Sequence, residues 1–164
     1  MKVKIKKLSP EAVLPSYALE GDAGLDIYAL EDSEVSPGAR AMIPTGVAIE
    51  IPKGYVALVW DKGGIAYKNG IKTMAGVCDS NYRGEYKIII LNTSKEIFKV
   101  KKGNKIAQIL IQKVEQAEIE EVKDLSDTER GSGGFGSTGL TSKSNYDIGA
   151  LSQNKFKEDI KKFL

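Results

Sequence analysis

Short apolar runs, separated by glycine, proline and asparagine, set the pattern of the first 122 residues. Residues 1–8 alternate lysine with valine, isoleucine and leucine, a period of two that is typical of a half-buried strand with a basic outer face. Residues 55–60 form a continuous apolar run, which predicts a buried strand. Further strands are predicted around Asp26, over residues 40–51 with a bend at Thr45-Gly46, and over residues 106–111 and 117–122.

Helical signals are few in this part of the chain. Residues 65–69 predict one short helical turn, which Gly70 ends. Turns are predicted at Pro37-Gly38 and at Gly103-Asn104. Short strands broken at this spacing are typical of an all-β barrel or sandwich, and not of alternating strands and helices. We therefore expect an all-β domain.

Residues 76–92 hold the groups best suited to chemistry. An apolar run ends at Asp79, a polar turn follows, and a strongly β-forming run begins at Tyr86. We predict a hairpin with the Asp79 carboxylate on one arm and the Tyr82 ring at its tip. Together with Arg83, these groups are able to position a water, a planar group and a phosphate. A hairpin with a merely polar tip is the alternative.

The character of the chain changes after residue 122. Residues 124–139 hold few apolar side chains and a run of glycines, so we expect this segment to be mobile by itself. Beyond it, apolar residues recur at helical intervals and Glu158 and Lys162 form an i,i+4 pair, which predicts an amphipathic helix over residues 152–163. We divide the chain into a β-rich domain (1–122), a closing arm (123–140) and a C-terminal tail (141–164).

The absence of histidine narrows the chemistry most. It excludes Ser-His-Asp and Cys-His catalysis, zinc sites that contain histidine, and the His-x-Glu zinc deaminases. Catalysis must then use carboxylates, lysine, arginine, tyrosine, backbone groups or a hard cation such as magnesium.

Charge and cysteine content bear on partners and compartment. Lysine and arginine number 24 against 22 aspartates and glutamates, which argues against a dedicated nucleic-acid binder. The single Cys78 excludes a disulfide framework within the chain and suits a reducing compartment; by itself it is most simply a small buried apolar residue. With no leading signal segment and no run long enough to span a bilayer, we expect a cytoplasmic protein with no membrane partner.

Two further stretches carry groups suited to phosphate. Residues 62–64 (Lys-Gly-Gly) follow a strand and offer a cation with exposed backbone donors. Residues 131–136 match G-x-G-x-x-G, yet no strand precedes them, so a dinucleotide fold is not predicted and a flexible linker is the alternative. Arg130 and Phe135 favour a lid over a nucleotide, because they add a charge and a stacking face. Asp26 taken alone is most simply a turn-stabilising aspartate.

Taken in order, five stretches resemble the five motifs of the trimeric dUTP diphosphatase (dUTPase) family. The third and fifth are highly specific, and their order and spacing make chance a poor explanation. The five stretches are residues 23–26 (Ala-Gly-Leu-Asp), 61–66 (Asp-Lys-Gly-Gly-Ile-Ala), 76–84 (Gly-Val-Cys-Asp-Ser-Asn-Tyr-Arg-Gly), 103–108 (Gly-Asn-Lys-Ile-Ala-Gln) and 130–139.

The resemblance implies a jelly-roll β-barrel and a homotrimer whose active sites lie between subunits, each closed by an arm. It implies that dUTP is hydrolysed to dUMP and pyrophosphate, with Mg2+ bound to the triphosphate. Asp79 would orient and deprotonate the water that attacks the α-phosphorus. Asp26 would contact the metal through water, since magnesium keeps part of its hydration shell.

Substrate-binding residues also follow from the resemblance. Tyr82 would lie under the deoxyribose and exclude a 2′-hydroxyl, and Phe135 would stack over uracil. The other implied residues are Thr73, Gly76, Val77, Cys78 and Lys87 around the base, Lys62, Gly63, Gly64 and Gln108 at the phosphates, and Arg130, Gly136, Ser137 and Thr138 in the closing arm.

This chain departs from the family pattern in the second motif, which usually reads Pro-Arg-Ser-Gly. Lys62 keeps a charge but lacks the bidentate fork of arginine. Gly63 removes a hydroxyl that meets the phosphate chain in relatives, which costs on the order of 10²–10³ in rate if that hydroxyl serves the transition state. In the fourth motif Asn104-Lys105 replaces the common Asp-Arg. The resemblance does not cover the tail.

Two other functions fit parts of this pattern. Gly63 and the tail are compatible with a dUTPase-fold nucleotide-binding or regulatory protein with weak hydrolysis. A dCTP deaminase relative would share the trimeric fold, but that family lacks the Gly-Phe-Gly-Ser-Thr closing arm. Release of pyrophosphate from dUTP or of ammonia from dCTP distinguishes the two enzymes.

Overall fold

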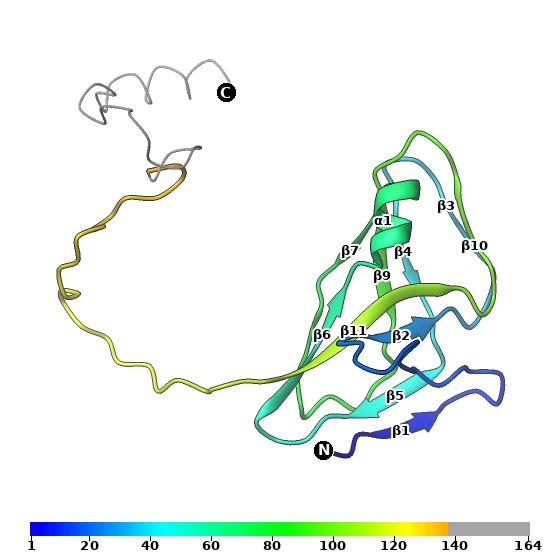
Figure 1. The fold of residues 1–164 in the computed structure, drawn as a ribbon, viewed down its shortest axis with the longest axis horizontal. Coiled ribbons are helices and arrows are strands. Elements are labelled where there is room, and N and C mark those ends of the chain that lie inside the picture. The colour runs from blue at the N-terminus through cyan, green and yellow to red at the C-terminus, as the bar shows by residue number, and fades with distance from the viewer. Residues whose placement is uncertain (138–164) are drawn as a thin grey trace. The chain divides into compact units, whose positions relative to one another are not determined.

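The structure is a computed structural model that describes residues 1–137. The chain divides into two units, Met1–Glu118 and Ile119–Leu164, and all the strands and the helix that the structure describes belong to the first (Figure 1). The predicted helix over residues 152–163 lies outside the described residues. The elements are β1 (Lys4–Lys7), β2 (Leu25–Tyr28), β3 (Ser33–Val35), β4 (Arg40–Ile43), β5 (Val47–Glu50), β6 (Tyr55–Trp60), α1 (Gly63–Asn69), β7 (Ile71–Met74), β8 (Val77–Cys78), β9 (Ile88–Asn92), β10 (Phe98–Val100) and β11 (Lys105–Lys113).

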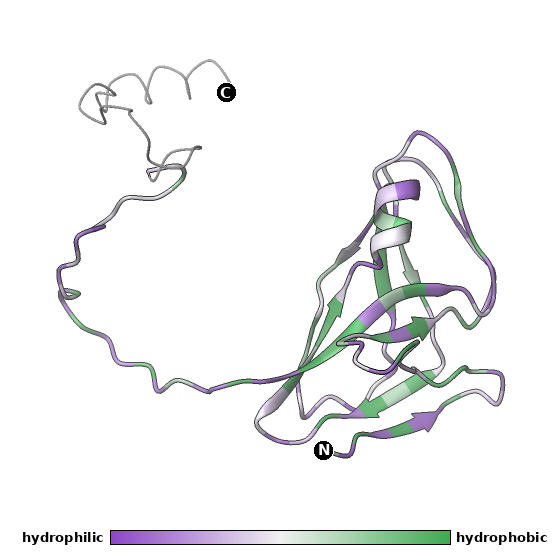
Figure 2. Ribbon diagram, viewed as in Figure 1, coloured by the Kyte–Doolittle hydropathy of each residue, from purple (hydrophilic) through white to green (hydrophobic). Residues whose placement is uncertain are grey.

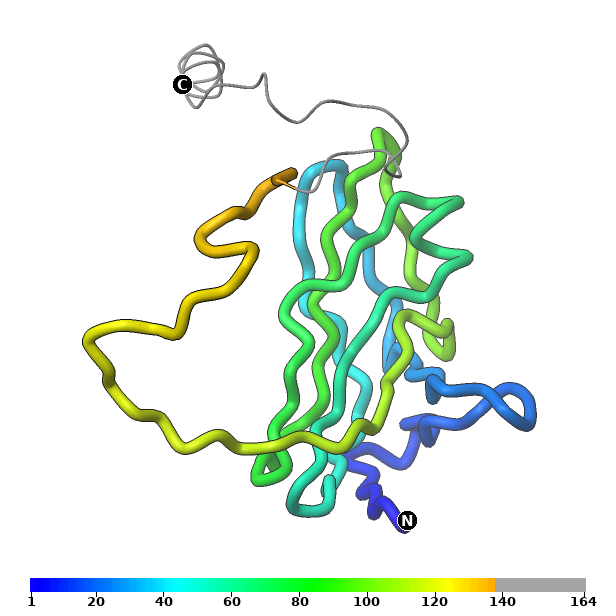
Figure 3. Tube along the Cα trace, turned by 60° about the vertical axis from the view of Figure 1, so that its left-hand side comes forward, coloured from blue at the N-terminus to red at the C-terminus, as the bar shows by residue number. Residues whose placement is uncertain are grey.

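The strands pair in four small antiparallel sheets, which confirms the all-β prediction. The largest sheet has the order β2-β11-β6-β8, and the next has the order β4-β9-β7. Figure 3 shows the three strands of the second sheet side by side. β1 pairs with β5, and β3 pairs with β10. Within the described residues, no helix is long and apolar enough to cross a membrane.

The core lies between these sheets and consists mainly of isoleucine and valine. β9 shows how the alternation works, because Ile88, Ile90 and Asn92 are buried while the residues between them are partly exposed. Apolar stretches coincide with the strands (Figure 2). The amide of Asn92 is fully buried but satisfied, since its nitrogen donates to the carbonyls of Val35 at 2.8 Å and Glu96 at 2.7 Å.

Several local predictions are confirmed. The segment of residues 40–51 bends at Thr45-Gly46, where the chain leaves the sheet of β4 and enters the pair β1-β5. Gly46 has a left-handed φ of 69°, which glycine adopts without steric cost. Gly70 ends α1 in a left-handed conformation and its N–H donates to the carbonyl of Ala66, although the helix begins two residues earlier than predicted.

The predicted hairpin is wrong. β8 pairs with β6, with Cys78 opposite Ala57, whereas β9 pairs with β4 and β7. Residues 79–87 therefore cross from one sheet to another. A local sequence pattern identifies a β-forming run but not the strand with which it pairs. Because β7 was not predicted, its pairing with β9, which competes with the hairpin, could not be predicted either.

The predicted strand over residues 117–122 is also wrong within the described part of the chain. These residues are exposed throughout and form no ladder with residues 1–137. Their alternation of apolar and acidic residues is a strand pattern, but a strand forms only where a sheet edge accepts it.

Candidate functional site

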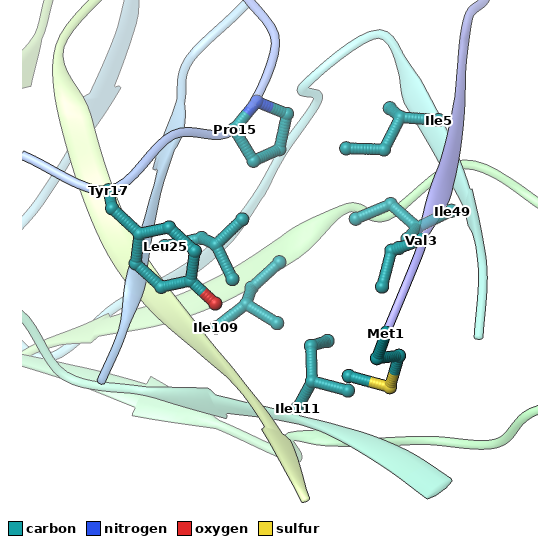
Figure 4. A pocket seen from close by; sticks show the side chains of 9 residues that line it. All are labelled: Met1, Val3, Ile5, Pro15, Tyr17, Leu25, Ile49, Ile109 and Ile111. Atoms are coloured by element: carbon teal, nitrogen blue, oxygen red, sulfur yellow. The ribbon is translucent and has the colours of Figure 1, made fainter. Parts of the chain in front are cut away.

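Two of the hollows in the first unit differ in the side chains that line them, and one of these two contains charged groups. The first, with a volume of about 160 Å³, is lined almost wholly by apolar side chains (Figure 4). It lies between β1 and β11 and carries no carboxylate, lysine or arginine among its described lining residues, which are Met1, Val3, Ile5, Pro15, Tyr17, Leu25, Ile49, Ile109 and Ile111.

The second hollow has a volume of about 420 Å³ and contains the residues of the third motif. It brings together Val77, Cys78, Asp79, Tyr82 and Lys87, all of which the sequence predicted. Sequence reasoning missed the other lining residues, which are Met42, Glu85, Tyr86 and Ile89. The β4–β9 register places Met42 opposite Ile89, a long-range pairing that leaves no local signal.

Gly76 allows β8 to lie against β6. A Cβ atom on this glycine would lie 2.8 Å from the carbonyl oxygen of Val59, and its φ is 127°. Because L residues avoid this conformation and this contact, glycine is required here. The N–H of Val59 donates to the Gly76 carbonyl at 2.8 Å, so the backbone leading to Asp79 is fixed just before the carboxylate.

A tight turn follows Asp79, whose own carbonyl accepts from the Tyr82 N–H at 3.1 Å. The Arg83 guanidinium donates to the carbonyls of Ser80 at 2.7 Å and of Tyr82 at 2.8 Å. Arg83 therefore braces the turn and does not line the hollow. The Tyr82 ring is 45% exposed and packs against Tyr86 at a centroid distance of 5.8 Å, tilted by 50°.

Two titratable groups below this turn are held neutral. Burial raises the pKa of the Cys78 thiol, and the neighbouring Asp79 raises it further. Burial also raises the pKa of the Tyr86 phenol well above its usual range. The Tyr86 hydroxyl has no hydrogen-bond partner among the described residues, although the residue is only 2% exposed.

Replacing Tyr86 by phenylalanine should stabilise the protein. A buried hydroxyl without a partner costs about 1–3 kcal/mol, and Tyr86→Phe removes it while keeping the ring. We expect the free energy of unfolding, measured by urea titration, to rise by about 1 kcal/mol. Tyr28→Phe is the matched control, because the Tyr28 hydroxyl lies 3.0 Å from Ser16 Oγ and its removal should not stabilise. A lower unfolding free energy for Tyr86→Phe would show that the hydroxyl has a partner.

A second cluster, of one carboxylate and two lysines, lies where β2, β6 and β11 meet. Asp26 is 3% exposed; its Oδ1 accepts from Lys62 Nζ at 2.6 Å, and its Oδ2 lies 2.5 Å from Lys105 Nζ. Burial opposes the charge of Asp26, but its hydrogen bonds and ion pairs with Lys105 and Lys62 prevail and hold its pKa below the usual range. Two ammonium groups share one carboxylate, so the cluster keeps a positive charge in excess.

Gln108 and Asp61 complete this end of the sheet. The Gln108 side-chain nitrogen donates to the Asp61 carbonyl at 2.9 Å, and Gly24 lies so close that a Cβ there would be 2.8 Å from Gln108 Oε1. The Asp61 carboxylate accepts from both the N–H and the hydroxyl of Thr73 at 2.6 Å, and from Lys72 at 2.7 Å. Burial opposes its charge, but these bonds lower the Asp61 pKa overall. Thr73 thus lies beside Asp61 and does not line the second hollow.

The two halves of the predicted site lie far apart within one chain. Asp79 follows Cys78, which is opposite Ala57, whereas Lys62 lies just beyond the end of β6. At about 3.3 Å per strand residue, these positions are separated by about 20 Å along β6.

The arm, described by itself up to residue 137, consists of short turns. The Arg130 side chain donates to the Gly133 carbonyl at 2.8 Å, and the Ser137 N–H donates to the Gly134 carbonyl at 3.1 Å. Phe135 is wholly exposed and has a left-handed φ of 47°, which is uncommon for an aromatic residue. Gly136 follows it with a φ of 98°, and Thr138 lies outside the described residues.

The comparisons with known proteins agree with this architecture. The domain is all-β, its second hollow contains Asp79 and Tyr82, and Asp26 lies in a cluster with two lysines. These features are typical of a β-barrel protein that binds nucleotides. The dUTPase family model matches residues 10–139, and the chain belongs to the dUTPase family. The structure accordingly has the jelly-roll fold of that family.

Two relatives are similar over nearly their whole length. The deoxyuridine 5′-triphosphate nucleotidohydrolase of Nautilia profundicola is 50% identical over 141 residues, which cover 85% of this chain and 99% of the relative. That of Gloeothece citriformis is 49% identical over 144 residues, covering 87% and 99%.

Two solved structures share the fold. A mutant dUTPase of Staphylococcus bacteriophage 80alpha, solved with dUpNHpp, has a TM-score of 0.80 at 29% identity and covers 85% of this chain and 99% of its own. A mutant dUTPase of phage phi11 of S. aureus, described for its coordination of a structural Mg(II) ion, has a TM-score of 0.73 at 25% identity and covers 77% and 100%.

Proposed function

We propose that this protein is a dUTP diphosphatase, which hydrolyses dUTP to dUMP and pyrophosphate. The observation that carries the proposal is the second hollow, where Asp79 and Tyr82 of the third motif face one cavity in a chain of the dUTPase family. The deciding assay incubates the protein with dUTP and follows pyrophosphate. Ammonia released from dCTP would favour a deaminase, and binding of dUTP without either product would favour a regulatory protein.

In the proposed mechanism Asp79 is the general base. It lies exposed at the end of β8, where the Gly76 backbone fixes its position. Its carboxylate accepts a proton from a water molecule, whose oxygen forms a bond to the α-phosphorus. The bond from that phosphorus to the oxygen bridging to the β-phosphorus breaks, and pyrophosphate leaves with the electron pair.

We propose that the same hollow selects the nucleoside. The Tyr82 ring is half exposed at the turn, as a platform under a sugar must be, and its bulk would exclude a 2′-hydroxyl. Backbone groups of Gly76, Val77 and Cys78, and of Lys87, would read the edge of uracil by hydrogen bonds. The neutral Cys78 thiol adds no charge beside the base.

The cationic cluster is proposed to hold the phosphate chain. Its excess positive charge attracts an anion, and Gly63 and Gly64 leave backbone donors uncovered at the start of α1. Gln108 would contribute its side-chain amide. Thr73 would support this end through Asp61 and not through the base.

Magnesium fits this site as part of the substrate and not as a resident ion. Among residues 1–137, no group of three or more carboxylate or cysteine side chains is arranged to hold a metal. Each oxygen of Asp26 faces one lysine, so we propose that Asp26 contacts the metal through water and not by a direct bond. We therefore propose the magnesium complex of dUTP as the substrate, with the metal carried by phosphate oxygens and water.

We propose further that each active site is shared between copies of this chain in a homotrimer. The phosphate chain begins at the atom that the Asp79 water attacks, yet Lys62 of the same chain is about 20 Å away along β6. One chain therefore cannot place both residues on one nucleotide. Apolar side chains near both halves are also exposed, among them Trp60 at 52%, Tyr67 at 91% and Val77 at 71%.

Mixing two inactive variants tests the shared site. Asp79→Asn removes the base and Gln108→Leu removes a phosphate contact, so trimers of either alone should be nearly inactive. The two variants are then unfolded and refolded together. A site is intact wherever the Gln108→Leu variant supplies Asp79 and the Asp79→Asn variant supplies Gln108. We expect recovery of about a quarter of wild-type activity for random mixing. Mixed trimers without activity, identified by two affinity tags, would place the whole site in one chain.

The arm of residues 123–140 is proposed to close over the bound nucleotide. Phe135 has a fully exposed ring and a strained backbone, and Arg130 bonds only within its own turn among the described contacts. A bound nucleotide would give both residues a partner. Arg130, Ser137 and Thr138 would bind the γ-phosphate, and Phe135, which Gly136 follows, would stack over the base.

We propose a cytoplasmic protein with neither nucleic acid nor membrane as partner. We propose residues 141–164 as a separate tail.

A further inference from the structure

Gly84 and Glu85 have no role in the mechanism so far, yet both contact the Tyr82 ring. A Cβ atom placed on Gly84 would lie 2.6 Å from Cζ and 2.9 Å from Cε2 of Tyr82. Real Cβ atoms essentially never come within 3.0 Å of another heavy atom. The φ of Gly84 is not in the left-handed region, so the backbone itself would accept another residue. A side chain at this position would therefore displace the outer end of the Tyr82 ring, which lies directly over the glycine.

Glu85 holds the other end of the ring. Its carbonyl accepts a hydrogen bond from the Tyr82 hydroxyl at 3.1 Å. Its carboxylate Oε1 accepts from the backbone N–H groups of Thr45 at 3.1 Å and Gly46 at 2.8 Å, at the corner between β4 and β5. The Thr45 hydroxyl in turn donates to the Tyr86 carbonyl at 2.7 Å. The turn that carries Tyr82 is thus anchored to a corner that lies about forty positions earlier in the chain.

Three neighbouring residues contact the ring. Gly84 lies beneath it, Glu85 holds the hydroxyl, and Tyr86 packs against it at a centroid distance of 5.8 Å. We propose that Gly84 and Glu85 are positioning residues, which fix the plane of the Tyr82 ring and thereby set the preference for deoxyribonucleotides. This inference rests on the proposed function, in which Tyr82 lies under the deoxyribose.

A double-mutant cycle separates positioning from mere support of the fold. The ratio of kcat/KM for dUTP to that for UTP is measured for the wild type, Gly84→Ala, Tyr82→Ala and the double variant. The alanine methyl should displace the ring from under the sugar, so dUTP loses its platform and the 2′-hydroxyl of UTP is no longer excluded. We expect Gly84→Ala to lower the ratio by about tenfold to a hundredfold. In the Tyr82→Ala background the same change should have no further effect on the ratio.

Glu85 is tested through its carboxylate. Glu85→Ala should lower the same ratio by about tenfold, because the anchored turn is released. Glu85→Gln keeps an acceptor oxygen for the Thr45 and Gly46 N–H groups and should restore most of the ratio. Glu34→Ala is the control, since Glu34 is an exposed residue of β3 whose carboxylate lies 3.6 Å from Lys99.

The outcomes are distinguishable. A ratio that falls with Tyr82→Ala but stays constant with Gly84→Ala and Glu85→Ala overturns the positioning role and leaves the proposed function standing. Equal losses of kcat for dUTP and UTP, repeated in the Tyr82→Ala background and accompanied by a lower unfolding temperature, overturn it as well, because they indicate structural support only. A wild-type protein that releases no pyrophosphate from dUTP overturns the proposed function itself.

Discussion

Replacing Asp79 by asparagine should reduce the turnover of dUTP by about 10²–10⁴-fold, the range that a positioned general base contributes. Asparagine has nearly the same shape as aspartate, so the turn that follows residue 79 should form as before. Its amide cannot accept a proton from water at neutral pH, so the attacking oxygen would lose its base. The measurement is kcat for pyrophosphate release at saturating dUTP.

Two comparisons make this prediction specific. Asp32→Asn is the matched control, because Asp32 is exposed, pairs with Lys101 at 2.7 Å and lies outside the hollow. It should keep wild-type turnover. Binding of a non-hydrolysable dUTP analogue by the Asp79→Asn variant, measured by calorimetry, should stay within about tenfold of wild type, because the base acts on water. Undiminished kcat in the Asp79→Asn variant would remove Asp79 from the catalytic step.

Replacing Gly63 by serine should raise turnover, by up to about 10²-fold if the restored hydroxyl reaches the transition state. Gly63 is the first residue of α1, and its φ lies outside the left-handed region. A Cβ built there meets no atom within 4 Å. The site therefore has both the backbone conformation and the space for serine, and the change should cost no stability.

Gly64→Ser is the matched control for this gain of function. A Cβ on Gly64 would likewise meet no atom within 4 Å. Gly64 lies one residue further along α1, where the side chain points about 100° away around the helix. Only the Gly63 variant should therefore gain turnover at saturating dUTP. A loss in the Gly63→Ser variant would contradict the placing of residues 62–64 at the phosphates.

Local chemistry explains which parts of the fold could be predicted from the sequence. The left-handed end of α1 at Gly70 and the bend at Thr45-Gly46 depend on residues next to each other in the chain, and both are confirmed. The pairing of β8 with β6 depends on competition among distant strands, and the hairpin predicted in its place is wrong. Periodicity indicated most of the strands, but it also predicted one over residues 117–122 that does not form, missed β7, and says little about strand partners.

The candidate site divides in the same way. The third motif predicted Asp79 and Tyr82, which line one hollow in the structure. Its walls on β4 and β9 were missed, because Met42 and Ile89 carry no chemical signature. The ion pairs of Asp26 also went unpredicted, although each residue belongs to one of the five motifs, since Asp26 and Lys62 are 36 positions apart.

The cluster around Asp26 has a consequence for folding. Its three charged residues come from β2, from the residue before α1 and from β11, so they meet only when β11 has paired with both of its neighbours. Contacts between such distant segments form late, because long loops must close first. In a chain that is still folding, or in which β11 has detached, Lys62 and Lys105 would therefore be separate and solvated, and the cationic cluster would be absent. The gain of affinity for polyphosphate during refolding would then mark the step at which the sheet β2-β11-β6-β8 forms.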